Sequence, residues 1–114
     1  MYCPILVWNC KGVAGNSFLK HLKSIFSIHQ IKIMVLMETR TSGLQAETII
    51  KKIGFNRSHR IEAMGSSGIW ILWKDGITIH VIQNNWQFIH MKVTISMEHS
   101  FLFTVVYESP TPGY

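Results

Sequence analysis

The chain has 114 residues, which is enough for one domain and too few for two. Hydrophobic residues make up 47% of it, so it can build a core and is not a disordered protein. No apolar run reaches the length of a membrane span, so we expect no membrane partner. The net charge of +5 favours a polyanionic partner such as nucleic acid, although a solvated basic face would give the same balance.

The two cysteines favour a reducing compartment. Cys3 and Cys10 are seven residues apart in one predicted strand and turn. An odd spacing directs side chains to opposite faces of a strand, so an internal disulfide is not expected. The simplest interpretation is an intracellular protein, and the sequence leaves the exact compartment open.

The first part of the chain predicts a strand followed by a helix. Residues 5–9 form a short apolar strand, and residues 11–15 form a glycine-containing loop. Asn16 is the predicted N-cap of a helix that ends near His29. Apolar residues recur on one face of this helix while lysines and a histidine lie opposite, which is typical of a helix that covers a sheet.

A second strand and helix follow in the same way. Residues 31–37 are almost wholly apolar, as in a strand that is covered on both faces. Ser42 and Gln45 predict a capping box at the start of the helix. Gly54 suits the position after its last turn, where a left-handed backbone commonly ends a helix.

After residue 54 the apolar period changes from 3.6 to 2, which predicts strands over residues 55–63, 69–74, 77–81, 89–95 and 101–107. Asp75-Gly76 predicts a two-residue hairpin between the second and third of these, and residues 65–68 predict a flexible turn. Residues 89–95 alternate apolar and polar side chains, so this strand should have one face in water.

Three polar side chains stand where apolar strands end, and open α/β sheets usually build their sites there. Glu38 could supply a carboxylate to Mg²⁺, or it could be a solvated or Arg40-paired residue. Asn9 could orient a phosphate or another side chain, or it could simply form a turn. Tyr107 could donate its hydroxyl to a phosphate, or it could be an ordinary strand aromatic.

Four short motifs now suggest a family: Trp8-Asn9-Cys10-Lys11-Gly12, residues 35–40 with Glu38-Thr39-Arg40, residues 68–73 with Trp70 and Trp73, and Val106-Tyr107-Glu108-Ser109-Pro110. In this order and spacing the chain resembles the endonuclease/exonuclease/phosphatase family. Within that family it is most similar to the apurinic-like endonuclease domain of plant non-LTR (LINE-type) retrotransposons, and the resemblance covers nearly the whole chain.

The resemblance implies a fold. The family packs two β-sheets face to face with helices on both outer faces. We therefore expect an α/β (α+β) chain that forms the N-terminal half of a four-layered α/β/β/α sandwich, with one mixed sheet and two helices on one face. Residues 1–114 would be a single partial domain, truncated before the second sheet.

The resemblance also implies a chemistry. The family cleaves phosphodiester bonds with Mg²⁺ or Mn²⁺, its retrotransposon members nick DNA, and a nucleus would be the expected compartment. By this resemblance Asn9 organises the active site, Glu38 binds the metal, and Tyr107 contacts the scissile phosphate, so these three are the expected catalytic residues. No other cofactor is implied.

The chain departs from the family by lacking its later motifs, which are an Asp-x-Asn segment, a further Asp and a Ser-Asp-His-like segment. We expect a fragment of a Mg²⁺-dependent DNA endonuclease that is inactive as an isolated chain. The alternatives are a non-catalytic nucleic-acid-binding module and a decayed gene product without a selected role. An uncovered sheet face would favour self-association, with Ile71, Trp73, Ile89, Met91, Val93 and residues 101–107 as candidates.

Overall fold

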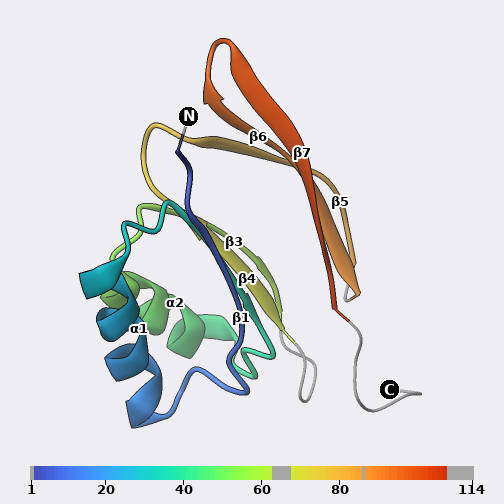
Figure 1. The fold of residues 1–114 in the computed structure, drawn as a ribbon. Coiled ribbons are helices and arrows are strands. Elements are labelled where there is room, and N and C mark those ends of the chain that lie inside the picture. Colours follow the sequence, from blue (N-terminus) through green and yellow to red (C-terminus); the bar gives the residue numbers. More distant parts are fainter. Residues whose placement is uncertain (1, 63–67, 86, 108–114) are drawn as a thin grey trace. The chain divides into compact units, whose positions relative to one another are not determined.

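The structure is a computed structural model that describes residues 2–62, 68–85 and 87–107. The chain divides into two compact units, residues 1–74 and residues 75–114 (Figure 1). Residues 65–67 of the expected turn and residues 108–110 of the last motif lie outside the described residues. That residues 1–114 form a single partial domain stays a prediction.

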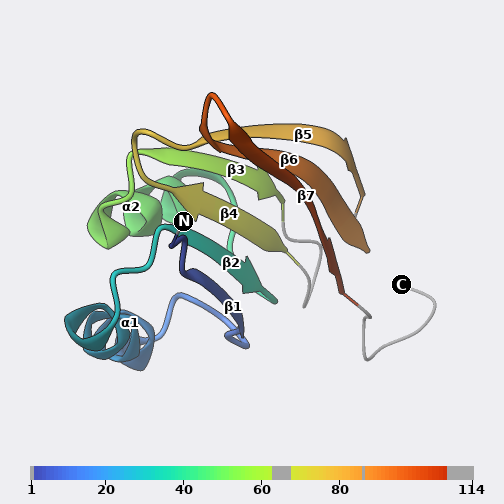
Figure 2. The ribbon, with the colours of Figure 1, turned by 45° about the horizontal axis from the view of Figure 1, so that its top comes forward.

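The first unit follows the predicted β-α-β-α order and then adds an antiparallel pair of strands. Its elements are β1 (Ile5–Asn9), α1 (Asn16–Ile28), β2 (Ile33–Met37), α2 (Gly43–Ile53), β3 (Arg57–Ile61) and β4 (Ile69–Trp73). β1 runs parallel to β2, whereas β4 is antiparallel to both β2 and β3. The sheet is therefore mixed, with the order β1-β2-β4-β3 that Figure 2 shows.

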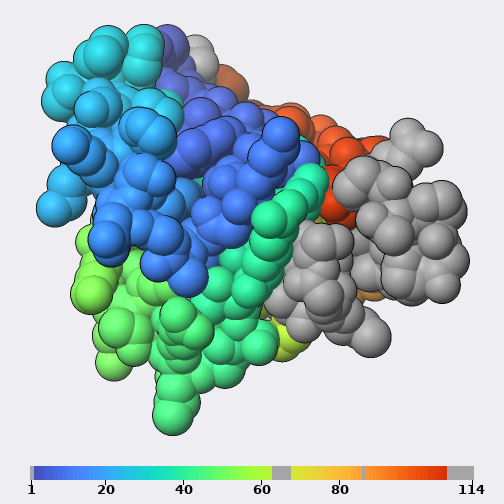
Figure 3. Space-filling model, turned by 90° about the horizontal axis from the view of Figure 1, so that it is seen from below, coloured from blue at the N-terminus to red at the C-terminus, as the bar shows by residue number. Residues whose placement is uncertain are grey.

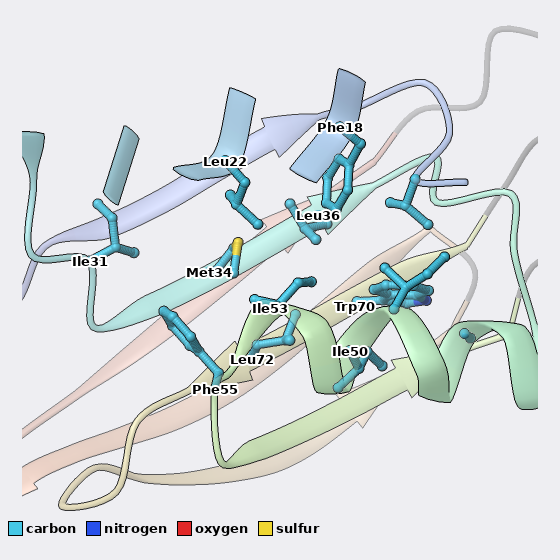
Figure 4. Packing of buried hydrophobic residues seen from close by; sticks show 13 residues of the cluster. Phe18, Leu22, Ile31, Met34, Leu36, Ile50, Ile53, Phe55, Trp70 and Leu72 are labelled. Atoms are coloured by element: carbon cyan, nitrogen blue, oxygen red, sulfur yellow. The ribbon is translucent and has the colours of Figure 1, made fainter. Parts of the chain in front are cut away.

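Both helices pack on one face of this sheet. The buried hydrophobic cluster takes Met34 and Leu36 from β2, Trp70 and Leu72 from β4, and apolar residues from α1 and α2. Alternate residues of a strand share a face, so this set marks a single face of the sheet. Figure 4 shows these side chains gathered between strands and helices. The expected α+β class, with a mixed sheet that carries two helices on one face, is confirmed.

The helix ends follow the predicted cap residues with two differences. α2 starts after Ser42, whose backbone is extended, and finishes at Gly54 with a φ of 87°. The capping-box prediction is wrong in its hydrogen bond, because Ser42 makes no side-chain cap. In α1 the N-cap is Gly15, and Asn16 is already the first helical residue. Neither described helix has the length and apolar character needed to cross a membrane.

The second unit is an antiparallel meander. Its strands are β5 (Thr78–Asn84), β6 (Phe88–Ser96) and β7 (His99–Val106), in the order β5-β6-β7. In β6, Ile89, Met91 and Val93 are fully buried while Lys92 is exposed, which confirms the predicted alternation. These strands form a sheet of their own, and the expected truncation of the domain stays a prediction.

The Asp75-Gly76 hairpin prediction is wrong. β4 pairs with β2 along one edge and with β3 along the other, so no edge of β4 is left for β5. β5 pairs with β6 instead. The dipeptide is still a turn, with Gly76 at a φ of 95°, but it joins two sheets rather than two neighbouring strands.

The expected uncovered face also needs correcting. Among the candidates for exposure, Ile71, Ile89, Met91 and Val93 are fully buried and Trp73 is half-buried. On β7, Leu102 and Val106 are 65% and 71% exposed on an edge strand. Self-association through such residues stays a prediction.

We expect Leu22→Ala to destabilise the first unit strongly and Leu44→Ala to leave it nearly unchanged. Both leucines lie in helices, but Leu22 is 1% exposed within the core cluster and Leu44 is 81% exposed. Emptying a buried leucine site costs about 2–5 kcal/mol, whereas an exposed substitution changes stability by about 0.5 kcal/mol or less. Urea unfolding followed by circular dichroism measures both, and equal midpoints for the two variants would contradict the assigned core.

Candidate functional site

Asn9 and Glu38 meet at the carboxyl ends of β1 and β2. Asn9 is the last residue of β1, and its register partner Met37 is the last residue of β2. Glu38 follows directly, so the parallel pairing of the two strands brings the amide and the carboxylate to the same edge. Asn9 Nδ2 donates a hydrogen bond to Glu38 Oε2 at 2.7 Å. Two of the three expected site residues are therefore in contact.

The loops that leave these strands are hydrogen-bonded to one another. The backbone N–H of Gly12 donates to the carbonyl of Glu38 at 2.7 Å, and that of Val13 donates to the carbonyl of Thr39 at 3.2 Å. On the other side, the N–H of Thr39 donates to the carbonyl of Gly68, which precedes β4. Figure 3 views this end of the first unit, where the surface of the β1–α1 loop in blue borders that of the β2–α2 loop in green. Backbone hydrogen bonds therefore hold the loops around Glu38 in place.

The backbone at the site is held in a rare conformation. Glu38, Arg40 and Lys11 have φ angles of 55°, 54° and 51°, in the left-handed region that side chains other than glycine seldom adopt. Each such residue costs on the order of 1 kcal/mol, and this cost persists only where surrounding contacts enforce it. Here the loop-to-loop hydrogen bonds supply those contacts. Strain of this kind gathers at functional sites, and Glu38 is at its centre.

The Glu38 carboxylate is buried and compensated. The residue is 5% exposed, and a charge removed from water needs hydrogen bonds and an opposite charge. Besides the Asn9 amide, the Arg40 guanidinium supplies them, with Nη2 at 2.8 Å from Oε1. The Arg40 side chain is 43% exposed, so the pair runs from the protein interior to water. The Arg40-paired alternative weighed for Glu38 is therefore present, and it coexists with the Asn9 contact.

Sequence reasoning missed Thr39. This threonine is fully buried beside Glu38, and Thr41 is buried two residues further on. Among the described residues the Thr39 hydroxyl has no hydrogen-bond partner. A segment of threonines and a charged residue after an apolar strand is typical of an exposed loop, so hydropathy gives no signal for this burial.

Cys10 follows Asn9 in the chain, and its side chain is a neutral thiol. Its Sγ is 3.2 Å from the carbonyl oxygen of Met37, to which it donates. Burial raises the pKa of Cys10 to about 11, and its hydrogen bonds and the nearby charges of Glu38 and Arg40 change this less. A metal-binding cysteine must be a thiolate, so Cys10 is not suited to be a ligand. Cys3 and Cys10 are both free cysteines.

The chemical type of the Glu38 carboxylate is that of a ligand to a hard cation. Within the described part of the chain, no three His, Cys, Asp or Glu side chains cluster closely enough to hold a metal ion by themselves. Mg²⁺ prefers oxygen ligands, and it is often bound by one or two carboxylates together with water and substrate phosphate. That Glu38 is such a ligand stays a prediction.

Tyr107 belongs to the second unit. It directly follows β7, it is 4% exposed, and its backbone N–H donates to the carbonyl of Gln87 at 2.6 Å. The hydrogen bond anchors the residue at the end of the meander next to the start of β6. Its convergence with Asn9 and Glu38 stays a prediction.

The fold is similar to that of a solved enzyme, the AP endonuclease LMAP from Leishmania major. The TM-score is 0.63 at 12% sequence identity, over 90% of this chain and 39% of that one. The chain thus spans about two fifths of the length of the enzyme. At this identity the likeness shows a shared endonuclease-like fold. No protein-family model matches the chain, and no curated protein does either.

We expect Cys10 to resist alkylation until the solution is strongly basic. Below its pKa of about 11 the thiolate fraction rises about tenfold per pH unit, so the rate should still be climbing between about pH 8 and pH 10. An ordinary thiol, with a pKa of about 8.5, levels off over this range. Mass spectrometry of a Cys3→Ser variant treated with iodoacetamide measures the rate, with the urea-unfolded chain as control. A plateau in the folded chain would show that the thiol is not buried as described.

Proposed function

We propose that this chain is a nuclease-type domain that binds a phosphodiester of DNA with Mg²⁺ or Mn²⁺ held at Glu38. The observation that supports it most directly is the hydrogen bond of 2.7 Å from Asn9 to Glu38 at the ends of two parallel strands. The fold, which the chain shares with an AP endonuclease, agrees with this chemistry. The motif resemblance adds a retrotransposon origin to the proposal.

Each proposed site residue has one role. Glu38 offers a carboxylate oxygen to the cation, and Asn9 orients that carboxylate by holding Oε2. Tyr107 donates its phenolic O–H to a non-bridging phosphate oxygen. A bound divalent cation polarises the phosphoryl group and stabilises the charge that develops on its oxygens. The rigid loops serve the same chemistry, because a preorganised carboxylate needs little reorganisation when the cation binds.

We further propose that residues 1–114 cleave DNA slowly or not at all by themselves. The sequence contains a single aspartate, Asp75, and it has no Asp-x-Asn or Ser-Asp-His segment. Hydrolysis needs a base or an activated water as well as a metal ligand, and such groups act as a unit. One carboxylate that positions a cation supports binding of a phosphate better than it supports turnover.

A non-catalytic nucleic-acid-binding module is the second candidate. Lys11 and Arg40 are both exposed and lie on the two loops that border Glu38. Exposed cations attract a phosphate backbone without reading its sequence, and the net charge of +5 has the same sign. In this alternative the basic residues, rather than Glu38, provide the affinity for DNA.

We expect Glu38→Gln to weaken Mn²⁺ binding by about tenfold or more, because an amide carries no charge for the cation. The matched control is Glu62→Gln, which removes a carboxylate that pairs with Arg60 at 2.8 Å elsewhere in the same unit. Calorimetric titration with Mn²⁺ measures both, and thermal melting checks that each variant is folded. Equal losses in the two variants, or none in Glu38→Gln, would refute the metal role of Glu38.

With plasmid DNA and Mn²⁺ we expect salt-dependent binding and nicking no faster than in buffer. Binding should weaken steeply between about 50 and 200 mM salt, as phosphate contacts require. Gel shift and agarose gels measure the two effects in one mixture. Salt-dependent binding that survives Glu38→Gln would support the module over the nuclease. Robust nicking that Glu38→Gln abolishes would overturn the proposed inactivity.

A further inference from the structure

Each oxygen of the Glu38 carboxylate faces a donor of a different kind. Oε2 accepts from the neutral amide of Asn9 at 2.7 Å, and Oε1 accepts from the cationic guanidinium of Arg40 at 2.8 Å. We infer that Arg40 competes with a divalent cation for Oε1 of Glu38 and so lowers the affinity of the site for that cation. This inference rests on the proposed metal role of Glu38.

The two donors differ in how easily a cation would displace them from the Glu38 carboxylate. Asn9 has a short side chain on a strand whose backbone pairs with β2, and its amide carries no charge to repel a cation. Arg40 has a long side chain that is 43% exposed, so its guanidinium can turn into water when a cation takes over the charge of Glu38. A cation that approaches Oε1 would therefore displace Arg40 and leave Asn9 in place.

The competition is both steric and electrostatic. Nη2 of Arg40 lies 2.8 Å from Oε1 and so takes up one of the lone-pair directions of that oxygen, which leaves fewer directions for a metal–oxygen bond. A guanidinium is protonated at any ordinary pH, so it also places a full positive charge beside the incoming cation. Partial exposure screens this repulsion, which limits the expected effect to about one order of magnitude in affinity.

Arg40 is therefore a positioning residue that acts through Glu38. With the cation absent, its guanidinium keeps the buried carboxylate compensated. A displaced guanidinium would still be tethered two residues from Glu38, where it could pair with a phosphate that the cation binds. Loading of the cation and binding of an anionic substrate should then favour one another.

Arg40→Met tests the inference, with Arg60→Met as the matched control. Methionine removes the charge of Arg40 but keeps an aliphatic stem beside the loop of Gly12, where a Cβ on that glycine would lie 3.8 Å from Arg40 Cδ. Arg60→Met lowers the net charge equally and breaks an ion pair of the same length, 2.8 Å, with Glu62. Neither change adds a group that could bind a metal through oxygen.

We expect Arg40→Met to tighten Mn²⁺ binding by about tenfold and Arg60→Met to change it by less than about twofold. Electron paramagnetic resonance of free Mn²⁺ measures the affinity, and circular dichroism checks the fold. Arg40→Lys, which keeps the charge, should stay near the parent chain. Adding Glu38→Gln should abolish the difference between Arg40→Met and the parent.

The outcomes separate the inference from the function on which it rests. Glu38-dependent binding that Arg40→Met leaves unchanged or weakens would overturn the competition while the metal role of Glu38 stands. Equal tightening by Arg40→Met and Arg60→Met would reduce the effect to net charge and also overturn it. No Glu38-dependent binding in any variant would overturn the proposed function itself.

Discussion

The parallel pairing of β1 and β2 is the interaction on which the rest of the structure depends. Two parallel neighbours need a crossover connection, and α1 provides it while covering one face of the sheet. The same pairing puts both carboxyl ends at one edge, so that the side chain at the end of β1 and the side chain after β2 meet. Without this ladder Asn9 and Glu38 would have no reason to touch.

A buried carboxylate then determines the chemistry of that edge. The described surroundings of Glu38 include an amide that leaves the charge unaltered and a guanidinium that balances it, and its backbone is forced out of the preferred region. Together they keep a carboxylate out of water at the edge of the sheet.

Much of the first unit could be predicted because its signals are local. Apolar runs predict β2 and β4, amphipathic periodicity predicts α1 and α2, and a strand–helix–strand order implies parallel neighbours, from which the meeting of Asn9 and Glu38 follows. The hairpin at Asp75-Gly76 could not be judged locally. A dipeptide signals a turn, but which strands pair depends on whether distant strands already occupy both edges of β4, as β2 and β3 do.

The finer features of the site could not be predicted from the sequence either, because they also depend on contacts between distant segments. The burial of Thr39 and the left-handed backbone at Arg40 come from hydrogen bonds between loops that are far apart in sequence. Ser42 stands at the expected N-cap, yet its hydroxyl makes no cap, since residue preference gives the position and not the rotamer. The sequence allows Arg40 to be named as a partner of Glu38. It does not show that Asn9 and Arg40 each contact a different oxygen of the carboxylate.

The left-handed backbone of Glu38 has a consequence for which amino acids would replace it in evolution. Glycine adopts such a φ of 55° freely, and asparagine does so more readily than glutamate. If folding were the sole requirement, either residue would relieve the backbone and also free the protein from burying a charge. A glutamate here is a poor choice for a scaffold and a reasonable one for a ligand, so relaxed selection should erase this side chain early while leaving the sheet intact.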